Sequence, residues 1–201
     1  MILETITVGK LSTNCYLLAD DDGHGVIIDP GDHAEKLLDI AREKKIHIEA
    51  IWLTHGHFDH ILAVNEIQEA THADIYISAG DQDALHDPTK NLLAYIHPNL
   101  IINLEANKVL HEGDVIYAGS IPFTVWETPG HTPGSICFAC DKEMVLFSGD
   151  TLFAEGGYGR TDLPGGDEAV MKNSLARLSQ VTDPFHVYPG HGNDFILGES
   201  L

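Results

Sequence analysis

Basic residues are scarce in this sequence. Lysine and arginine together number 11, against 31 aspartates and glutamates, and the formal net charge at pH 7 is −20. A protein that binds nucleic acid needs a basic surface to neutralise phosphates, and an anionic membrane attracts basic surfaces for the same reason. We therefore expect no nucleic-acid partner and no membrane partner, and we expect the acidic excess to keep the protein soluble.

Long apolar segments are lacking as well. No apolar run approaches the ~18 residues that a membrane-spanning helix needs. The first residues, MILETITVGK, include Glu4 and have no basic segment ahead of a long apolar one, unlike a secretory signal. These absences predict a cytoplasmic protein, and they leave its oligomeric state open.

Cysteine occurs only three times, at Cys15, Cys137 and Cys140, which suits a reducing compartment better than a disulfide-bonded framework. Cys137 and Cys140 have the C-x-x-C spacing of many redox and metal sites. The surrounding SICFAC predicts a strand, however, and strand residues three apart point to opposite faces. We therefore expect these thiols to pack in the core.

Predicted strands and helices fill most of the 201 residues, and no linker or repeat interrupts them, so we expect a single domain over 1–201. Strands are predicted over 4–8, 15–20, 25–29, 49–54, 74–78, 109–119, 121–128, 135–141, 143–150 and 185–190. Helices are predicted over 33–46, 61–71 and 167–181, with a mixed helix-and-loop region over 79–96. This alternation indicates an α/β (α+β) sandwich.

Histidine and aspartate follow four of the predicted strands closely. The segments are WLTHGHFDH with His55, His57, Asp59 and His60, VWETPGHTPGS with His131, VLFSGDTLF with Asp150, and VYPGHG with His191. Loops at strand ends are where α/β folds build their sites. If the four ends share one edge, five imidazoles and two carboxylates converge there, and such crowding favours a bound cation.

Imidazole and carboxylate are ligands for zinc and iron, and a carboxylate can bridge two ions. His55 and His57 are two apart on an extended segment, so they can share one metal. Asp59 and His60 are adjacent at the start of the next helix, so they diverge toward a second position. Taken singly, Asp59 could cap that helix, and His131 and His191 could be loop histidines bonded to the backbone. The combined pattern favours metal binding.

These motifs resemble those of the metallo-β-lactamase superfamily over nearly the whole chain. THGHFDH is similar to its signature, and TPGHTPGS, SGDTLF and YPGHG match its later motifs in order. VIIDPGD resembles the first motif, whose aspartate, here Asp29, supports the metal loop without ligating. The resemblance implies a four-layer αββα sandwich with two Zn²⁺ per chain, iron or manganese being alternatives. It implies a first metal on His55, His57 and His131, a second on Asp59, His60 and His191, and Asp150 as the bridge.

Within the superfamily the chain looks most like short glyoxalase II-like hydrolases, on the evidence of TNCYLL, GRTDLPGGD and YPGHG. That resemblance implies hydrolysis of small thioesters such as S-acylglutathiones by a hydroxide bridging two metals. Full-length glyoxalase II enzymes add a C-terminal helical domain that helps to hold glutathione, and we expect that domain to be absent because the sequence ends at Leu201. The bridging position of Asp150 argues against an antibiotic-hydrolysing subgroup with a cysteine near there.

A persulfide dioxygenase of the same fold is the main alternative. It uses one Fe(II) held by two histidines and an aspartate, which here would be His55, His131 and Asp150. Dioxygenases of this type tend to read GRTDFQ and YPAHD, so GRTDLP and YPGHG favour the hydrolase. Lactone or phosphoester hydrolysis stays open, because the same hydroxide serves each reaction.

Three further residues have roles that the sequence leaves open. We hypothesise that Asp59, besides ligating, orients the hydroxide or handles its proton. Arg160 either pairs with Asp162 or Asp167 to brace its loop or meets a substrate carboxylate. Tyr158 is expected to line the mouth of the site.

Overall fold

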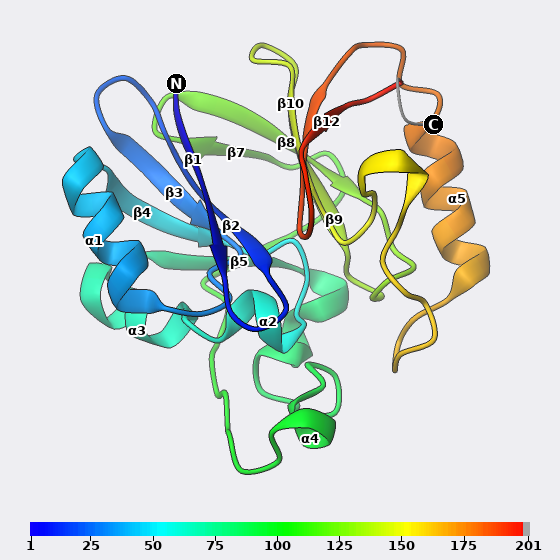
Figure 1. Ribbon diagram of the computed structural model, residues 1–201, viewed down its shortest axis with the longest axis horizontal. Helices are drawn as coiled ribbons and strands as arrows, with labels where there is room; N and C mark the ends of the chain where they lie inside the picture. Colours follow the sequence, from blue (N-terminus) through cyan, green and yellow to red (C-terminus); the bar gives the residue numbers. More distant parts are fainter. Residues whose placement is uncertain (199–201) are drawn as a thin grey trace.

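Two six-stranded β-sheets form the centre of residues 1–198, the part of the chain that the computed structural model describes (Figure 1). The first sheet contains, in spatial order, β1 (Ile2–Val8), β2 (Thr13–Ala19), β3 (His24–Ile28), β4 (His47–Trp52), β5 (Asp74–Ser78) and β6 (Lys108–Leu110). β1, β2 and β3 pair antiparallel, whereas β3 to β6 pair parallel. The C-terminal ends of β3, β4 and β5 therefore lie at one edge of this sheet.

The second sheet contains, in spatial order, β12 (Phe195–Ile196), β11 (His186–Pro189), β10 (Val145–Gly149), β9 (Ile136–Cys140), β8 (Ile121–Glu127) and β7 (Val115–Ala118). β10 and β11 pair parallel, and the other neighbours pair antiparallel. Because β9 runs opposite to both β8 and β10, the strands β8, β10 and β11 share one direction and end at the same edge.

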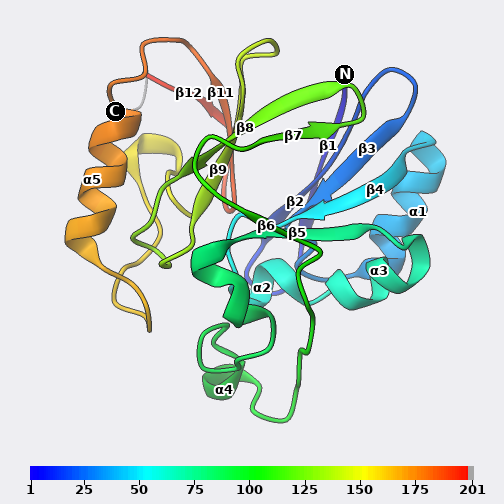
Figure 2. The same cartoon turned by 180° about the vertical axis from the view of Figure 1, so that it is seen from behind.

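Helices cover the outer faces of the two sheets. α1 (Ala34–Lys44) and α3 (Val64–Thr71) lie against the first sheet, and α5 (Glu168–Leu178) lies against the second (Figures 1 and 2). Shorter segments are α2 (Phe58–Ile61), α4 (Leu93–Ile96) and two 3₁₀ turns, η1 (Ala79–Leu85) and η2 (Ala154–Gly156). None of the helices in the described part of the chain has the length and apolarity needed to cross a membrane.

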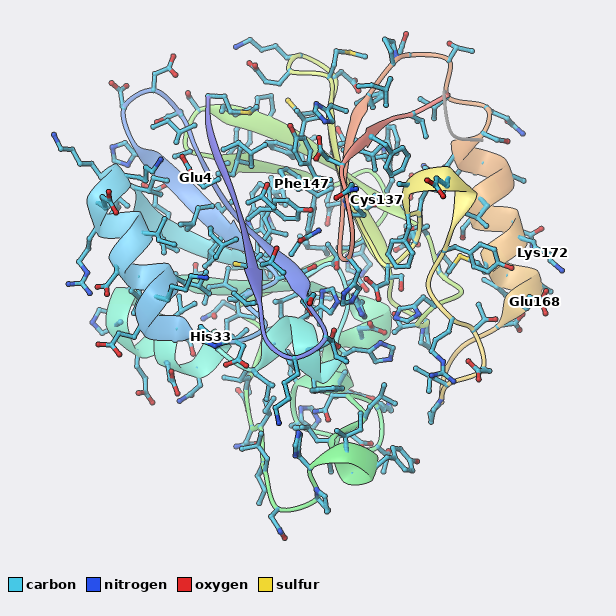
Figure 3. The ribbon with its side chains drawn as sticks, in the orientation of Figure 1. Glu4, His33, Cys137, Phe147, Glu168 and Lys172 are labelled. Atoms are coloured by element: carbon cyan, nitrogen blue, oxygen red, sulfur yellow. The ribbon has the colours of Figure 1, made fainter. Side chains whose placement is uncertain are left out.

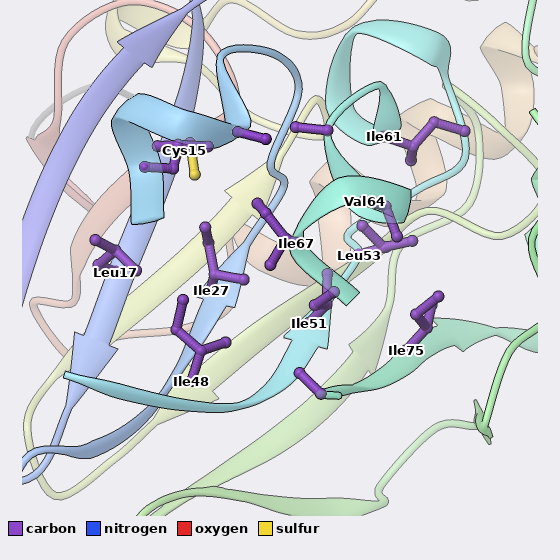
Figure 4. Close-up of a cluster of buried hydrophobic side chains, with 14 of the residues drawn as sticks. Cys15, Leu17, Ile27, Ile48, Ile51, Leu53, Ile61, Val64, Ile67 and Ile75 are labelled. Carbon is purple, nitrogen blue, oxygen red and sulfur yellow. The ribbon is translucent and has the colours of Figure 1, made fainter. Parts of the chain in front are cut away.

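Three apolar clusters separate these layers and confirm the predicted four-layer αββα sandwich. Leu37 of α1 and Ile67 of α3 pack with Ile51 on the outer face of the first sheet, the cluster shown in Figure 4. Between the sheets, the ring of Trp52 contacts the rings of Phe123 and Phe138, with centroids 5.5 and 5.1 Å apart. A third cluster joins α5 to the second sheet. The opposite side of α5 faces solvent, where Glu168 and Lys172 form an ion pair (Figure 3).

The helix predicted over 61–71 corresponds to α3, which begins three residues later at Val64, whereas Ile61 is the last residue of the one-turn helix α2. The N–H of Ala63 donates to the carbonyl of Pro30 rather than continuing the first helix. The loop that follows β3 presses closely on α2, since a Cβ on Gly31 would lie 1.6 Å from the carbonyl oxygen of Asp59. Tertiary contact with this loop therefore ends α2 after one turn, a break that helical periodicity does not reveal.

The segment 109–119 is also divided, because the chain crosses between the sheets there. β6 completes the first sheet at Leu110, and β7 begins the second at Val115. Two hydrogen bonds close the turn between them. The backbone N–H of His111 donates to the carboxylate of Asp114, and the backbone N–H of Asp114 donates to the carbonyl of His111. Both flanking segments have strand character, so sequence alone does not show that they belong to different sheets.

The predicted core packing of the cysteine thiols is confirmed. Cys15 lies in the cluster beneath α1 and α3 (Figure 4), and Cys137 lies between the second sheet and α5 (Figure 3). Cys140 lies between the two sheets. Cys137 and Cys140 thus face opposite sides of β9, as the strand assignment requires. Burial raises the pKa of Cys137 to about 11 and that of Cys15 well above its ordinary value.

We expect all three thiols to resist labelling in the native protein, because burial blocks the access of the reagent to each of them. For Cys15 and Cys137, the raised pKa also suppresses the reactive thiolate. In mildly alkaline buffer, a disulfide reagent such as dithionitrobenzoate should react at least ~10²-fold more slowly with native than with guanidinium-unfolded protein. Fast labelling of a native thiol would contradict this placement.

Candidate metal centre

Four strand ends meet at one edge of the sandwich that the two sheets form (Figures 1 and 2). β4 comes from the first sheet, and β8, β10 and β11 come from the second. The seven side chains that the sequence indicates as ligands are brought together there: His55, His57, Asp59 and His60 after β4, His131 after β8, Asp150 after β10 and His191 after β11. The expected shared edge is therefore present.

Three histidines form the first group of donors. Ligand atoms of His55, His57 and His131 all lie within 4.8 Å of one another, and all three residues are buried. The Nδ1 of His57 lies 2.8 Å from the Nε2 of His131. An aspartate and two histidines, Asp59, His60 and His191, form a second group within the same limit. The two groups match the two sets that the resemblance implies.

Asp150 lies between the two groups. Its Oδ1 is 3.5 Å from the Nε2 of His60, and its Oδ2 is 3.4 Å from the Nε2 of His131 and 3.6 Å from the Nε2 of His191. One carboxylate therefore reaches donors of both groups, which is the geometry that a bridging ligand needs.

Several buried polar atoms at this edge have no hydrogen-bond partner among residues 1–198. They are the Nε2 atoms of His55, His57 and His60 and the Oδ1 atom of Asp150. An unpartnered polar atom in a protein interior costs about 1–3 kcal/mol, so a concentration of them calls for a ligand. Nitrogen and carboxylate oxygen donors in this number suit two divalent cations, and the donor set fits a dinuclear metal site.

The protonation states of His55 and His57, two members of the first group, suit metal binding. Burial lowers the pKa of His57 to about 3, assisted by the neighbouring His131. Burial likewise lowers the pKa of His55 well below its ordinary value, and four nearby imidazoles add to the effect. These rings are therefore neutral at physiological pH, and the neutral ring is the form that ligates a metal.

The second group is electrostatically different because it contains carboxylates. Burial opposes ionisation of Asp59, but His60 and the hydrogen bonds from His191 and Thr13 outweigh it and hold the pKa of Asp59 well below its usual range. Burial lowers the pKa of His60, but the carboxylates of Asp59, Asp150 and Asp29 outweigh it and raise that pKa to about 10. Negative charge therefore accumulates here, and a divalent cation would neutralise it.

Asp29 supports two of the donors from behind, and its backbone adopts a left-handed conformation with φ of 50°. Its carboxylate accepts hydrogen bonds from the N–H of Thr54 at 2.8 Å, the hydroxyl of Thr54 at 2.6 Å and the Nδ1 of His60 at 2.9 Å. Because the Thr54 hydroxyl donates to Asp29, it accepts from the Nδ1 of His55 at 3.1 Å. Both rings therefore present Nε2 to the site, which is the support that the resemblance implies for Asp29.

Main-chain and hydroxyl groups fix other donors. The Nδ1 of His131 donates to the carbonyl of Arg160 at 2.7 Å, and the Nδ1 of His191 donates to the carbonyl of Leu11 at 3.1 Å. The hydroxyl of Thr13 donates to Asp59 Oδ2 at 2.9 Å. Asp59 does not cap α2, because His57 holds the N-cap position. Its carboxylate instead lies among the second group of donors.

Gly190 allows the chain to pass directly beside the donors. A Cβ at this position would lie 2.2 Å from Asp150 Oδ1 and 2.8 Å from the Cε1 of His60. Any other residue would therefore place carbon where the shared carboxylate and the second group meet. Glycine is required here by close approach.

Asp81 is a supporting residue that the sequence did not indicate. It is buried in η1 and accepts hydrogen bonds from the N–H of Gly56 at 2.9 Å, the hydroxyl of Thr132 at 2.7 Å and the N–H of Gly134 at 2.8 Å. Gly56 separates His55 from His57, and Thr132 follows His131, so Asp81 joins the two loops that carry the first group. The sequence feature that could have indicated Asp81 is its position just after the predicted strand 74–78, which ends at the same edge as the strands that carry the ligands.

Arg160 pairs with Asp162 through two hydrogen bonds, from Nε at 2.7 Å and from Nη2 at 2.6 Å. Asp167, the other proposed partner, instead caps α5 by accepting from the N–H groups of Ala169 and Val170. The side chain of Tyr158 is exposed, and it is not among those that line the cavity over the donors within residues 1–198. The structure thus places Arg160 at the cavity and Tyr158 beside it on the same loop.

A two-sheet sandwich with histidine and aspartate clusters at one edge defines a class of metal-dependent enzymes that includes hydrolases. The chain belongs to the metallo-beta-lactamase superfamily, whose family model matches residues 8–191. Its relatives include the Hydroxyacylglutathione hydrolase GloC of Haemophilus influenzae, 32% identical over 99% of this chain and 94% of the relative. The Probable metallo-hydrolase YqgX of Bacillus subtilis is 33% identical over 96% of this chain and 97% of the relative.

Three solved structures extend the comparison. The BLEG-1 B3 metallo-beta-lactamase has a TM-score of 0.93 and 35% identity, covering 98% of this chain and 95% of its own. The TTHA1623 protein in a di-iron-bound form has a TM-score of 0.86 and 36% identity, covering 97% and 95%. ETHE1 from Myxococcus xanthus has a TM-score of 0.81 and 29% identity, covering 99% and 81%. The fold and the superfamily resemblance predicted from sequence are confirmed.

Replacing Asp29 by Asn should lower metal affinity by about 10–100-fold, because outer hydrogen bonds orient the ligating rings of His55 and His60. Asparagine tolerates the left-handed backbone, so Asp29→Asn removes charge without adding strain. Zinc titration of the metal-free variant, with metal content measured after dialysis, checks this expectation. Unchanged affinity would show that Asp29 does not support the donors.

Asp81→Asn should lower the free energy of unfolding by about 1–3 kcal/mol, since an amide NH₂ would then face groups that are themselves donors. Asp83→Asn is the matched control, because the exposed side chain of Asp83 pairs with Lys90 at the surface and its replacement should change stability by less than ~0.5 kcal/mol. Urea unfolding of both variants with saturating zinc provides the measurement. Equal stability of the two variants would contradict a bracing role for Asp81.

Proposed function

We propose that the protein hydrolyses small thioesters at a site holding two zinc ions, and that it acts as a cytoplasmic enzyme on a small-molecule substrate. The observation that carries this proposal is the position of Asp150, whose two oxygens face both donor groups. Similarity to a relative named hydroxyacylglutathione hydrolase supports thioesters as the substrate class.

In this proposal His55, His57 and His131 hold one ion, Asp59, His60 and His191 hold the other, and Asp150 is shared. When bound, the two ions supply Lewis acidity toward the acyl oxygen and a nucleophilic water of lowered pKa. The chain itself fixes the rings through Asp29, Thr54 and the carbonyls of Leu11 and Arg160. Catalysis therefore depends on donors whose orientation is set before substrate arrives.

Asp59 has a second role in this proposal, which is to orient the attacking water. Its pKa lies well below the usual range, so the carboxylate stays ionised near neutral pH and is a weak proton acceptor there. Accepting a hydrogen bond from the water is therefore a better role for it than removing the proton. The hydroxyl of Thr13 donates a hydrogen bond to Oδ2 of Asp59 at 2.9 Å, which limits the rotation of the carboxylate.

Two alternatives have support from particular neighbours. The likeness to a B3 metallo-beta-lactamase supports a β-lactam as another acyl substrate for the same attack. The likeness to ETHE1 supports a mononuclear iron site on His55, His131 and Asp150. A complete second donor group favours the dinuclear site over the mononuclear one.

Metal analysis combined with a substrate panel tests the proposal. We expect two zinc ions per chain and turnover of thioesters, at rates well above those with a β-lactam, a lactone or a phosphoester. One iron per chain with oxygen consumption on a persulfide would replace the hydrolase by the dioxygenase. A preference for the β-lactam would instead assign the antibiotic as substrate.

Asp59→Asn should lower kcat for thioester hydrolysis by at least ~10²-fold, because the uncharged amide both weakens the second metal position and orients water less well. Metal content measured on the same preparation separates these two effects. Full turnover by a variant that retains both ions would remove Asp59 from the reaction.

A further inference from the structure

A cavity of about 430 Å³ lies directly over the candidate metal centre. Five of the seven expected ligands reach its surface: His57, Asp59, His131, Asp150 and His191. Whatever substrate reacts at the centre must therefore place its non-reacting part against the remaining walls of this cavity. Their chemistry bears on which thioesters the protein accepts.

Apolar side chains from four separate segments form those walls. The segments are the turn between β1 and β2, helix α2, the region around α4, and the loop between β10 and α5. The side chains are Leu11, Phe58, Leu92, Ile96, Phe153 and Leu163. Segments so far apart in sequence present the same chemistry at one place, which defines an apolar wall around the centre.

The apolar wall begins immediately beside the donors. The ring of Phe153 meets that of His191 edge-on, with centroids 6.1 Å apart. Phe58 lies in the chain between the ligands His57 and Asp59, and it packs with Leu92 in a small apolar cluster of its own. A group attached to a reacting carbon or sulfur would therefore contact hydrocarbon directly.

Cationic recognition is weak along this wall. Arg160 is the one lysine or arginine among the lining residues of the described chain, and its Nε and Nη2 donate to the carboxylate of Asp162. The net charge of −20 further disfavours an anionic substrate. Glutathione carries two carboxylates and little apolar surface, so it matches this cavity poorly.

We propose that the apolar wall selects thioesters whose acyl or thiol group is uncharged and apolar, and that glutathione thioesters are poor substrates. The proposal rests on thioester hydrolysis as the proposed function. Burial of hydrocarbon drives this selection, so recognition grows with the apolar area that the substrate offers.

Thiol binding tests the wall without requiring turnover. The protein is loaded with cobalt(II), and the charge-transfer absorption of bound thiolate is titrated with 1-propanethiol, 1-butanethiol, 1-hexanethiol and glutathione. We expect the Kd to fall about fourfold per methylene until the cavity is filled. We also expect glutathione to bind more weakly than 1-hexanethiol by at least ~10-fold. Equal affinity along the series, or tighter binding of glutathione, would overturn the proposal.

Ile96→Ser and Ile101→Ser form a matched pair of variants. Both isoleucines are exposed, at 47% and 83%, so neither substitution removes core packing. Ile96 lines the cavity, whereas Ile101 lies in the same region outside it. We expect Ile96→Ser to reduce the dependence on chain length and Ile101→Ser to retain that of the parent. Identical behaviour of the two variants would show that Ile96 does not form a selective wall.

Kinetics with the zinc-loaded protein then connect the wall to the reaction. Thioesters that vary in acyl length at constant thiol, and in thiol length at constant acyl group, are compared with S-lactoylglutathione. A kcat/KM that rises with apolar length in at least one series supports the proposal, and a preference for the glutathione thioester contradicts it. If no thioester is hydrolysed, the proposed function fails, while thiol binding still decides whether the wall selects apolar groups.

Discussion

Five imidazoles and two carboxylates share a largely buried volume at the edge where the two sheets meet. Several of their polar atoms find no hydrogen-bond partner in the described part of the chain, and the carboxylates bring negative charge to the second donor group. This concentration of unsatisfied donors is the constraint on which the surrounding structure depends. Cations at the shared edge would relieve it, and the residues behind the donors are arranged to keep them turned inward.

The support is divided between the two sheets. Asp29 and Thr54 follow strands of the first sheet and orient His55 and His60. Asp81 also follows a strand of the first sheet, β5, but it accepts hydrogen bonds from Thr132 and Gly134 in the loop after β8 of the second sheet. The first donor group therefore combines ligands from both sheets that share one buried carboxylate behind them. Relative movement of the sheets would disturb that group directly.

Sequence patterns predicted the metal-binding edge because its residues follow a local rule. The motif His55-x-His57-x-Asp59-His60 after an apolar strand predicts metal ligands from local sequence alone. Three further strands are likewise followed by a histidine or an aspartate. The resemblance then supplied the αββα order. Asp81 was not predicted, because a single aspartate after a strand is most often a turn or cap residue.

Features set by distant contacts were not predictable in the same way. The break between α2 and α3 depends on the carbonyl of Pro30, and the separation of β6 from β7 depends on which sheet each strand joins. The apolar wall has the same origin. Leu92 and Ile96 lie in a region without clear periodicity, and Leu92 is held beside the centre by packing with Phe58 and Leu93.

Two residues of the hairpin between β1 and β2, Leu11 in the turn and Thr13 at the start of β2, make three contacts at the site. Leu11 contributes a side chain to the wall and a carbonyl to His191, while Thr13 binds Asp59. Two donors of the second group thus depend on a surface turn, and their side chains keep 14% and 26% of their exposure. The first group is enclosed. The second donor group is therefore the one that a rearrangement of the N-terminal hairpin would reach directly.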